Sequence, residues 1–438
     1  MTDAGVGAAG YELRCGVLVD GTGQPAREDV SVVLDRGVVA AVTPWRDRRI
    51  QGKHEVLDFS DATVTPGLID GHAHLCWGSG QSPAWAGLPD DPAALVAWGI
   101  ASGSAALAAG ITTVVDCGSP AGLALLVRDL INSGVASGPR VYASGEAITT
   151  TGGHGEFIGT TADSATEMCR AIRGLVARGA DLIKIMVTGG ATDPHTNRRQ
   201  AQYSREELVP AINDAHRLGR LVVGHANATA GILNAVQAGI DVVAHCNWLG
   251  SEPDTVVMDM PTVQEMANRG IYVDLNLQGA RRPLAETDGK VVAWAEGVTK
   301  PASRWELLEP LRALGVGTYL SSDAFGPAIG SFPADLGQVV VEWDLPLEEL
   351  IHRVTAVPAQ ALGLADRGLI EPGRVGDFSV FDGDLRTTPS LANPKAVYRH
   401  GQPSVESSRL SLPDIARGYG AEAAAQQRFL EDVFNELP

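Results

Sequence analysis

The chain has 438 residues, a hydrophobic content of 45% and a formal net charge of −18. This composition is typical of a globular enzyme, and the acidic balance argues against nucleic acid or an anionic membrane as a partner. Five scattered cysteines without CxxC spacing favour free thiols in a reducing compartment over a disulfide framework. The first residues lack the pattern of a signal peptide and no apolar run reaches the length of a membrane span, so we expect a cytoplasmic protein.

Residues 11–65 read as short β-strands, because apolar and polar positions alternate between turn sequences. Short runs of the same kind return in residues 366–410. The simplest arrangement pairs the two groups of strands in one composite β-sandwich domain, built from residues 1–65 and 366–410. Residues 411–438 predict an amphipathic tail helix, which would pack on the protein or join subunits, and we expect a homo-oligomer.

Between these parts, residues 66–365 alternate nearly continuous apolar runs with segments long enough for helices. This alternation predicts a parallel sheet covered on both faces, and eight such units in about 250 residues predict a (β/α)8 TIM barrel. A doubly wound open sheet is the alternative, which the lack of a glycine-rich phosphate loop after the first run disfavours. The eight predicted strands are residues 64–69, 111–116, 141–148, 181–187, 221–226, 241–246, 271–275 and 317–323.

One connector between these strands carries a specific helix signal. Ser204 and Glu207 stand at the spacing of a capping box, which predicts a helix that continues to about Leu218, where Gly219 stops it. Pro210 inside this segment lacks a main-chain N–H, so we expect it to kink the helix or delay its start.

Metal-binding residue types stand where the predicted barrel strands end, the edge at which a barrel carries its chemistry. His72 and His74 share one face of an extended segment, because side chains alternate with period two, and they form a two-point metal clamp. Any one such histidine is more often a core or surface residue. Four of the 10 histidines fall at strand ends together with a lysine and an aspartate, which indicates one metal centre. The candidate ligands are His72, His74, Lys184, His225, His245 and Asp323.

Lys184 indicates the type of centre. It stands between Ile183 and Ile185 in an apolar strand, where an unpaired charge is costly. Burial and nearby cations favour a neutral amine, which can capture carbon dioxide as an anionic, bridging carbamate. The alternative is a lysine that reaches solvent or pairs with a carboxylate.

The sequence of residues 66–74, PGLIDGHAH, resembles the first-strand signature of the amidohydrolase superfamily, and the later candidate ligands match that superfamily strand by strand. A β domain that is split around a barrel is also common in that superfamily. Residues 151–155, TGGHG, and 183–190, IKIMVTGG, resemble the branch of imidazolonepropionase-like hydrolases, Xaa-Pro and Xaa-Arg dipeptidases and ochratoxinase-like amidases. One departure is Ala244, where many relatives have a glutamate before the histidine.

This resemblance implies a binuclear centre that cleaves an amide-type C–N bond in a dipeptide, an N-acyl amino acid, an aryl amide, or a carbamate or urea. One metal would be held by His72, His74 and Asp323, and the other by His225 and His245. Carboxylated Lys184 and a hydroxide would bridge the metals, and Asp323 would act as general base and acid. The nitrogen and oxygen ligands suit zinc, and cobalt, manganese or iron could occupy the same site.

Three other activities or roles remain open at this point. Cleavage of a lactone or a phosphotriester uses similar metal centres, and ring deamination usually needs one metal and no bridging lysine. A non-catalytic scaffold that descends from such enzymes is disfavoured, because scaffold proteins generally lose ligands and none is missing here.

Residues on loops after the strands are expected to contact substrate. His154, in a glycine-rich loop, could donate a hydrogen bond to a carbonyl or carboxylate, and Tyr203 resembles a tyrosine that relatives use against the polarised carbonyl oxygen. Basic loop residues in so acidic a chain favour a small-molecule substrate that carries a carboxylate. Each of these residues could equally be a packing or surface residue. The candidate substrate-binding residues are His154, Tyr203, Arg198, Arg199, Arg281 and Trp77, with His154 and Tyr203 also candidates for catalysis.

Overall fold

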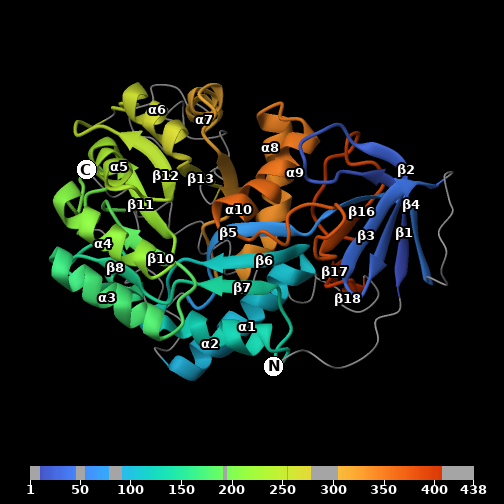
Figure 1. Cartoon of the computed structure of the whole chain (residues 1–438), viewed down its shortest axis with the longest axis horizontal. Helices are drawn as coiled ribbons and strands as arrows, with labels where there is room; N and C mark the ends of the chain where they lie inside the picture. Colours follow the sequence, from blue (N-terminus) through green and yellow to red (C-terminus); the bar gives the residue numbers. More distant parts are fainter. Residues whose placement is uncertain are drawn as a thin grey trace, which may run out of the picture.

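The computed structural model confirms the α/β class, with parallel-strand sheets and surrounding helices (Figure 1). Among the residues it describes, no helix is long and apolar enough to cross a membrane. All five cysteines are free. The described residues are 10–45, 55–77, 91–190, 195–253, 255–277 and 304–406.

Strands from both ends of the described chain form one seven-stranded sheet, in the order β18-β17-β16-β4-β1-β2-β3. The two groups meet where β16 pairs antiparallel with β4, with Ser379 opposite Thr65. A second layer for this sheet and the predicted domain boundaries stay predictions, and residues 411–438 lie outside the described residues. The strands are β1 Tyr11–Leu18, β2 Arg27–Asp35, β3 Val38–Pro44, β4 Glu55–Pro66, β16 Phe378–Asp382, β17 Ala396–Arg399 and β18 Gln402–Glu406.

The remaining strands run parallel in two sheets, ordered β14-β13-β12-β11-β10-β8-β9 and β15-β5-β6-β7. Each of the eight predicted runs holds a strand, and the third run holds two, β7 and β8, in the two different sheets. The strands are β5 Leu68–His74, β6 Ile111–Asp116, β7 Arg140–Ala143, β8 Ala147–Thr149, β9 Gly159–Thr161, β10 Ile183–Met186, β11 Val222–Ala228, β12 Val242–Leu249, β13 Tyr272–Asn276, β14 Thr318–Ser321 and β15 Ala324–Phe325.

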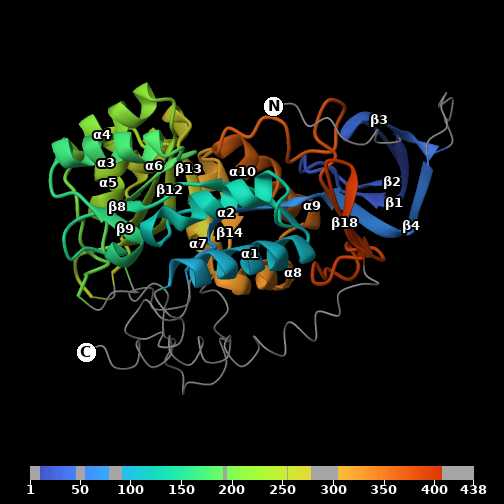
Figure 2. The same cartoon turned by 90° about the horizontal axis from the view of Figure 1, so that it is seen from below.

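Every residue of β5, β6, β10, β11 and β12 is buried, which explains their continuous apolar sequences. Helices surround these strands at one end of the molecule. The sheet made of β1–β4 and β16–β18 lies at the other end (Figures 1 and 2). The helices are α1 Pro92–Ala108, α2 Leu123–Asn132, α3 Ala165–Ala177, α4 Arg205–Arg217, α5 Thr229–Ala238, α6 Met260–Arg269, α7 Arg304–Ala313, α8 Phe332–Glu342, α9 Leu347–Arg353 and α10 Ala356–Ala361.

The predicted capping box begins α4, and both of its hydrogen bonds are present between Ser204 and Glu207. The helix ends at Arg217 with Leu218 as its C-cap, before Gly219 in the left-handed region. The expected delay at Pro210 is wrong, because the helix begins at Arg205 and runs through the proline. Burial of the apolar face of α4 offsets the missing hydrogen bond.

Candidate metal centre

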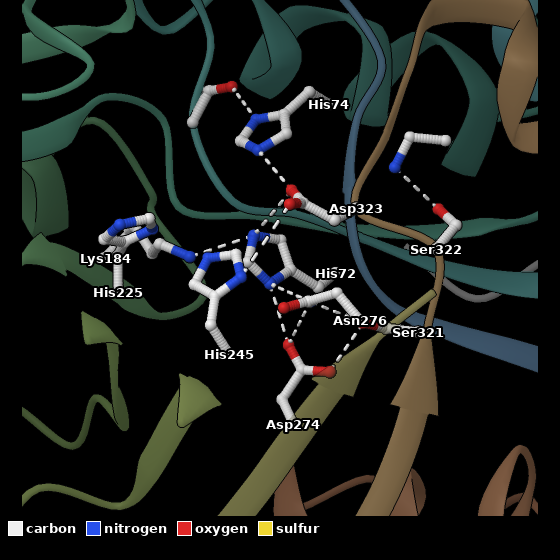
Figure 3. A network of polar contacts seen from close by, with 12 residues as sticks. His72, His74, Lys184, His225, His245, Asp274, Asn276, Ser321, Ser322 and Asp323 are labelled. Carbon is white, nitrogen blue, oxygen red and sulfur yellow. Dashed lines mark hydrogen bonds and ion pairs between the residues drawn. The ribbon is translucent and has the colours of Figure 1, made fainter. Parts of the chain in front are cut away.

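The six candidate ligands converge at the C-terminal ends of the parallel strands (Figure 3). His72 and His74 come from β5, Lys184 from β10, His225 from β11 and His245 from β12. Asp323 follows β14, and its main-chain N–H donates to the His72 carbonyl at 2.8 Å. The imidazole centroids of His72 lie 5.5 Å from His74 and 5.6 Å from His245, and those of His225 and His245 lie 4.2 Å apart. The structure therefore brings together all six side chains that the sequence indicated.

His72, His74 and Asp323 form the tightest group, because their ligand atoms all lie within 4.8 Å of one another. The Nε2 atoms of His72 and His74 lie 3.4 and 3.5 Å from Oδ1 of Asp323. The Nδ1 atom of His245 lies 4.0 Å from the other carboxylate oxygen. Imidazole nitrogens and a carboxylate oxygen are the ligands that zinc and similar divalent metals take.

Hydrogen bonds behind the rings decide which nitrogen can bind a metal. His74 Nδ1 lies 2.8 Å from the Gly118 carbonyl and His72 Nδ1 lies 2.7 Å from Oδ2 of Asp274, so each Nδ1 is a donor. Each Nε2 then turns a lone pair toward the Asp323 carboxylate, and two acceptors that face each other repel unless a cation lies between them. The donor set therefore fits a divalent metal.

His225 has its hydrogen-bond partners at Nε2, whereas the hydrogen bonds behind the rings of His72 and His74 are at Nδ1. The Nε2 atom of His225 is 3.2 Å from the Gly189 carbonyl and 2.8 Å from Nδ2 of Asn227. Nε2 can donate to the Gly189 carbonyl or accept from the Asn227 amide, and a proton on Nε2 would leave the lone pair on Nδ1. Asn247 on β12 donates to the Asn227 amide oxygen at 2.7 Å and so connects β12 to the residues beside His225.

Lys184 lies in the centre of the group with only 1% of its surface exposed. Its Nζ is 2.9 Å from Nε2 of His72, and its neighbours Ile183 and Ile185 are fully buried. The Lys184 amino group is thus buried among apolar strand neighbours, and its nitrogen contacts a candidate metal ligand, His72.

The electrostatics give the protonation states that metal binding requires. Burial and the nearby cationic groups lower the pKa of His72 and His225 well below the ordinary histidine value. Burial alone would raise the pKa of Asp323, but His72 and His74 more than compensate and lower it. At neutral pH the imidazoles of His72 and His225 are neutral and Asp323 is ionised, the forms that coordinate metals.

Two candidate ligands adopt an unusual backbone conformation. His245 and Asp323 have φ values of 67° and 52°, and Cys246 and Trp248 on the same strand as His245 have φ values of 50° and 54°. Non-glycine residues rarely occupy the left-handed region, and such strain gathers at functional sites. The surrounding structure holds these ligands in position at a conformational cost.

Two of the predicted substrate residues lie beside the ligands. His154 is buried with its ring centroid 4.4 Å from that of His225, and burial lowers its pKa to about 4. Trp77 packs edge-on to His74 at 5.4 Å and contacts Phe325 and Phe157, with ring centroids 3.7 and 4.7 Å away. These aromatic side chains border the His74 side of the group.

Other predicted substrate residues have structural partners instead. The Tyr203 hydroxyl donates to the Ala162 carbonyl at 2.8 Å and the side chain is buried in the main core, which favours a packing role, while the catalytic and substrate-binding role stays a prediction. Arg199 donates to the carbonyls of Gly250 and Thr255 and so links the loops after β10 and β12. Arg198 is partly buried on the same loop as Arg199. Arg281 lies outside the described residues.

A set of buried polar residues that the sequence pattern did not single out lies behind the ligands. Asp274 and Asn276 on β13 and Ser321 on β14 contact one another, and the first two also contact His72. Asp116 at the end of β6 accepts hydrogen bonds from the main-chain N–H groups of Leu75 and Gly118. Polar residues at positions i and i+2 of the otherwise apolar β13 were a usable signal, because both point to the same face.

Comparisons with known proteins agree with this geometry. Residues 63–406 match the model of the amidohydrolase family. Ochratoxinase from Aspergillus niger is 29% identical over 411 residues, which cover 85% of this chain and 78% of that protein. Imidazolonepropionase from Chromobacterium violaceum is 26% identical over 394 residues, 82% of this chain and 86% of that protein. The crystal structure of a Xaa-Pro dipeptidase with bound methionine shares the fold, with a TM-score of 0.77 and 24% identity over 90% of this chain and 99% of that one.

Proposed function

The chain belongs to the amidohydrolase family of hydrolases, and from this premise we propose that it cleaves an amide-type C–N bond at a centre of two divalent metal ions. The observation that carries the proposal is the convergence of His72, His74 and Asp323 with acceptor atoms turned toward one another. We also propose that the parallel strands close into a (β/α)8 barrel. Its support is the pairing of β15 with β5, because β15 follows directly after the last strand of the other sheet.

The proposed ligands divide between two metal positions. His72, His74 and Asp323 would hold the first ion, and His225 and His245 would hold the second. Lys184, as a carbamate, would supply an anionic ligand to both, and the support for this role is its burial and its contact with His72. Zinc suits these ligands, and cobalt, manganese or iron would also be accepted.

The residues of the centre have separate tasks in the proposed reaction. A divalent metal supplies Lewis acidity, which makes water more acidic and a carbonyl more electrophilic. Asp323 accepts a proton from the attacking water on a carboxylate oxygen and returns it to the leaving nitrogen. The position of its carboxylate, 3.4 and 3.5 Å from Nε2 of His72 and His74, supports this task, because it borders the site where the attacking water would be held. His154 lies beside His225, where its ring can orient the substrate carbonyl.

The substrate class follows from the same neighbourhood. Trp77, Phe157 and Phe325 offer an apolar wall next to His74, which suits a bulky or aromatic group beside the scissile bond. The similar proteins include an ochratoxinase and a Xaa-Pro dipeptidase. We propose a dipeptide, an N-acyl amino acid, an aryl amide, or a carbamate or urea as substrate.

The test is replacement of the proposed bridge. Lys184→Ala should lower the metal content below two ions per chain and abolish turnover, because the anionic bridge is lost. Added short carboxylic acids should restore part of both by supplying the missing carboxylate. Metal analysis and a substrate panel of dipeptides, N-acyl amino acids and aryl carbamates are the measurements.

Lys395→Ala is the matched control. Lys395 pairs with Asp61 of β4, in a different sheet from the candidate ligands, so its replacement should leave metal content and activity unchanged. A Lys184→Ala protein with two metals and full activity would refute the binuclear centre. Wild-type protein that holds one metal and deaminates its substrate, or that cleaves only lactones or phosphotriesters, would favour the corresponding alternative activity.

A further inference from the structure

Strand β13 supplies no ligand to the proposed centre, yet it carries a polar cluster directly behind His72 (Figure 3). Asp274, Asn276 and Ser321 are all fully buried. Oδ2 of Asp274 lies 2.7 Å from Nδ1 of His72, and Oδ1 accepts a hydrogen bond from the Ser321 hydroxyl at 2.5 Å. A buried carboxylate without a metal contact of its own requires an explanation, because its desolvation is costly.

The close contact with Asp274 places the proton of His72. Nδ2 of Asn276 lies 3.0 Å from Oδ2 of Asp274, 2.9 Å from the Ser321 oxygen and 3.1 Å from Nδ1 of His72, more neighbours than its two hydrogens can serve. The Ser321 hydroxyl donates its own hydrogen to Oδ1 of Asp274. Nδ1 of His72 lies 2.7 Å from Oδ2 of Asp274, and because a lone pair there would face a carboxylate oxygen, this nitrogen is the donor. Reversing the Asn276 amide would set its oxygen against the carboxylate, which is repulsive.

The partner of His72 differs in charge from the partners of two neighbouring histidines. Nδ1 of His74 meets the Gly118 carbonyl, and Nε2 of His225 meets the Gly189 carbonyl and the Asn227 amide, all of them neutral groups. His72 instead meets a carboxylate. A carboxylate behind a ligating imidazole holds its tautomer and makes it a stronger electron donor, as a neutral carbonyl does to a smaller degree.

We propose that Asp274 is a positioning residue that sets the metal affinity of the His72–His74–Asp323 site without touching the metal. Asn276 and Ser321 hold its carboxylate in place. The inference rests on the proposed function, because it takes His72 as a ligand. Loss of such a partner typically weakens metal binding by about 10- to 100-fold.

The experiment separates this role from mere stabilisation of the core. Zinc affinity and stoichiometry are measured by competition with a chromophoric chelator for the wild type, Asp274→Asn and the control Asp377→Asn. Asp377 is also a buried aspartate, 5% exposed, and pairs with Arg367 at 3.3 Å in the segment before β16. We expect both variants to melt at lower temperature, but only Asp274→Asn to bind one of its two zinc ions about 10- to 100-fold more weakly.

A second readout does not depend on zinc. In metal-free wild-type protein labelled with ¹⁵N-histidine, His72, assigned with His72→Gln, should carry its proton on Nδ1. If Asp274→Asn does not fold, Ser321→Ala takes its place, and we expect several-fold weaker binding at the same site because the carboxylate loses one donor.

Each outcome decides one claim. Two zinc ions bound with wild-type affinity in Asp274→Asn, or in Ser321→Ala where that variant stands in, would overturn the role of Asp274 and leave the metal centre intact. A His72 proton on Nε2 would overturn it as well. A wild-type chain that binds no zinc or other divalent metal would overturn the proposed function together with this inference.

Discussion

The replacement Tyr203→Phe separates two roles for a residue that the family resemblance marks as catalytic. In the structure the Tyr203 hydroxyl donates to the Ala162 carbonyl at 2.8 Å, and 1% of the residue is exposed. Removing the hydroxyl leaves the buried Ala162 carbonyl without this donor. The expected cost is about 1–3 kcal/mol in the free energy of unfolding, or a few degrees in melting temperature.

The same variant should keep its kcat/KM within about twofold of the wild type, because the hydroxyl faces the core. A tyrosine that stabilised the developing charge on a substrate carbonyl would lose about 100- to 1000-fold when its hydroxyl is removed. The assay is steady-state hydrolysis of any substrate found in the panel, together with a thermal melt. A loss of 100-fold with an unchanged melting temperature would refute the packing role.

Tyr319→Phe provides the matched control. Tyr319 is also a buried tyrosine, on β14, but its hydroxyl has no hydrogen-bond partner among the described residues. Removing an unpaired buried hydroxyl relieves a desolvation cost, so the variant should be as stable as the wild type or more so. Opposite changes in stability for the two replacements would support the hydrogen-bond assignment directly.

Two further expectations concern His154. Its pKa of about 4 lies below the ordinary 6.5, so the unfolded chain binds more protons between these values, and the free energy of unfolding of metal-free protein should fall by up to about 3 kcal/mol as pH drops from about 6.5 to 4. Urea titrations at several pH values should show this slope flatten in His154→Gln, and an unchanged slope would contradict the burial of a neutral His154. Gly190→Ala would put a methyl group 2.2 Å from the His154 ring and should lower kcat/KM about as much as His154→Ala, whereas Gly174→Ala on α3, with open space around it, should not. Equal activity of Gly190→Ala and Gly174→Ala would show that the position of the His154 ring does not matter.

The strands and the clustering of the candidate ligands could be predicted because their signals are local. Buried parallel strands need apolar residues on both faces, and the polar residues that follow them share one edge of the sheet. The proximity of His72 and His245 could therefore be predicted from the sequence. Whether the six side chains bind metal stays a prediction, as do the domain boundaries.

The overlooked residues depend on contacts that the sequence does not display. Asp274 meets His72 across 202 positions, and only the arrangement of β13 and β5 makes it a partner. Tyr203 and Arg199 stand on loops that follow strands, but position in a loop does not fix the direction of a side chain. Their hydrogen bonds to main-chain carbonyls became visible only once the neighbouring loops were in place.

The hydrogen bond from the Asp323 main chain to His72 bears on the order of events during synthesis. The His-x-His pair leaves the ribosome early, but Asp323, the third member of the tightest group, follows only after β14 and is placed when Ala324 of β15 pairs with Ala73. Contacts so distant in sequence form late in folding, because the intervening chain must first be ordered. Until Asp323 is in place, the nascent chain can offer the first metal position only the two nitrogens of the His-x-His pair, and tight loading of that position would mark the completion of the fold.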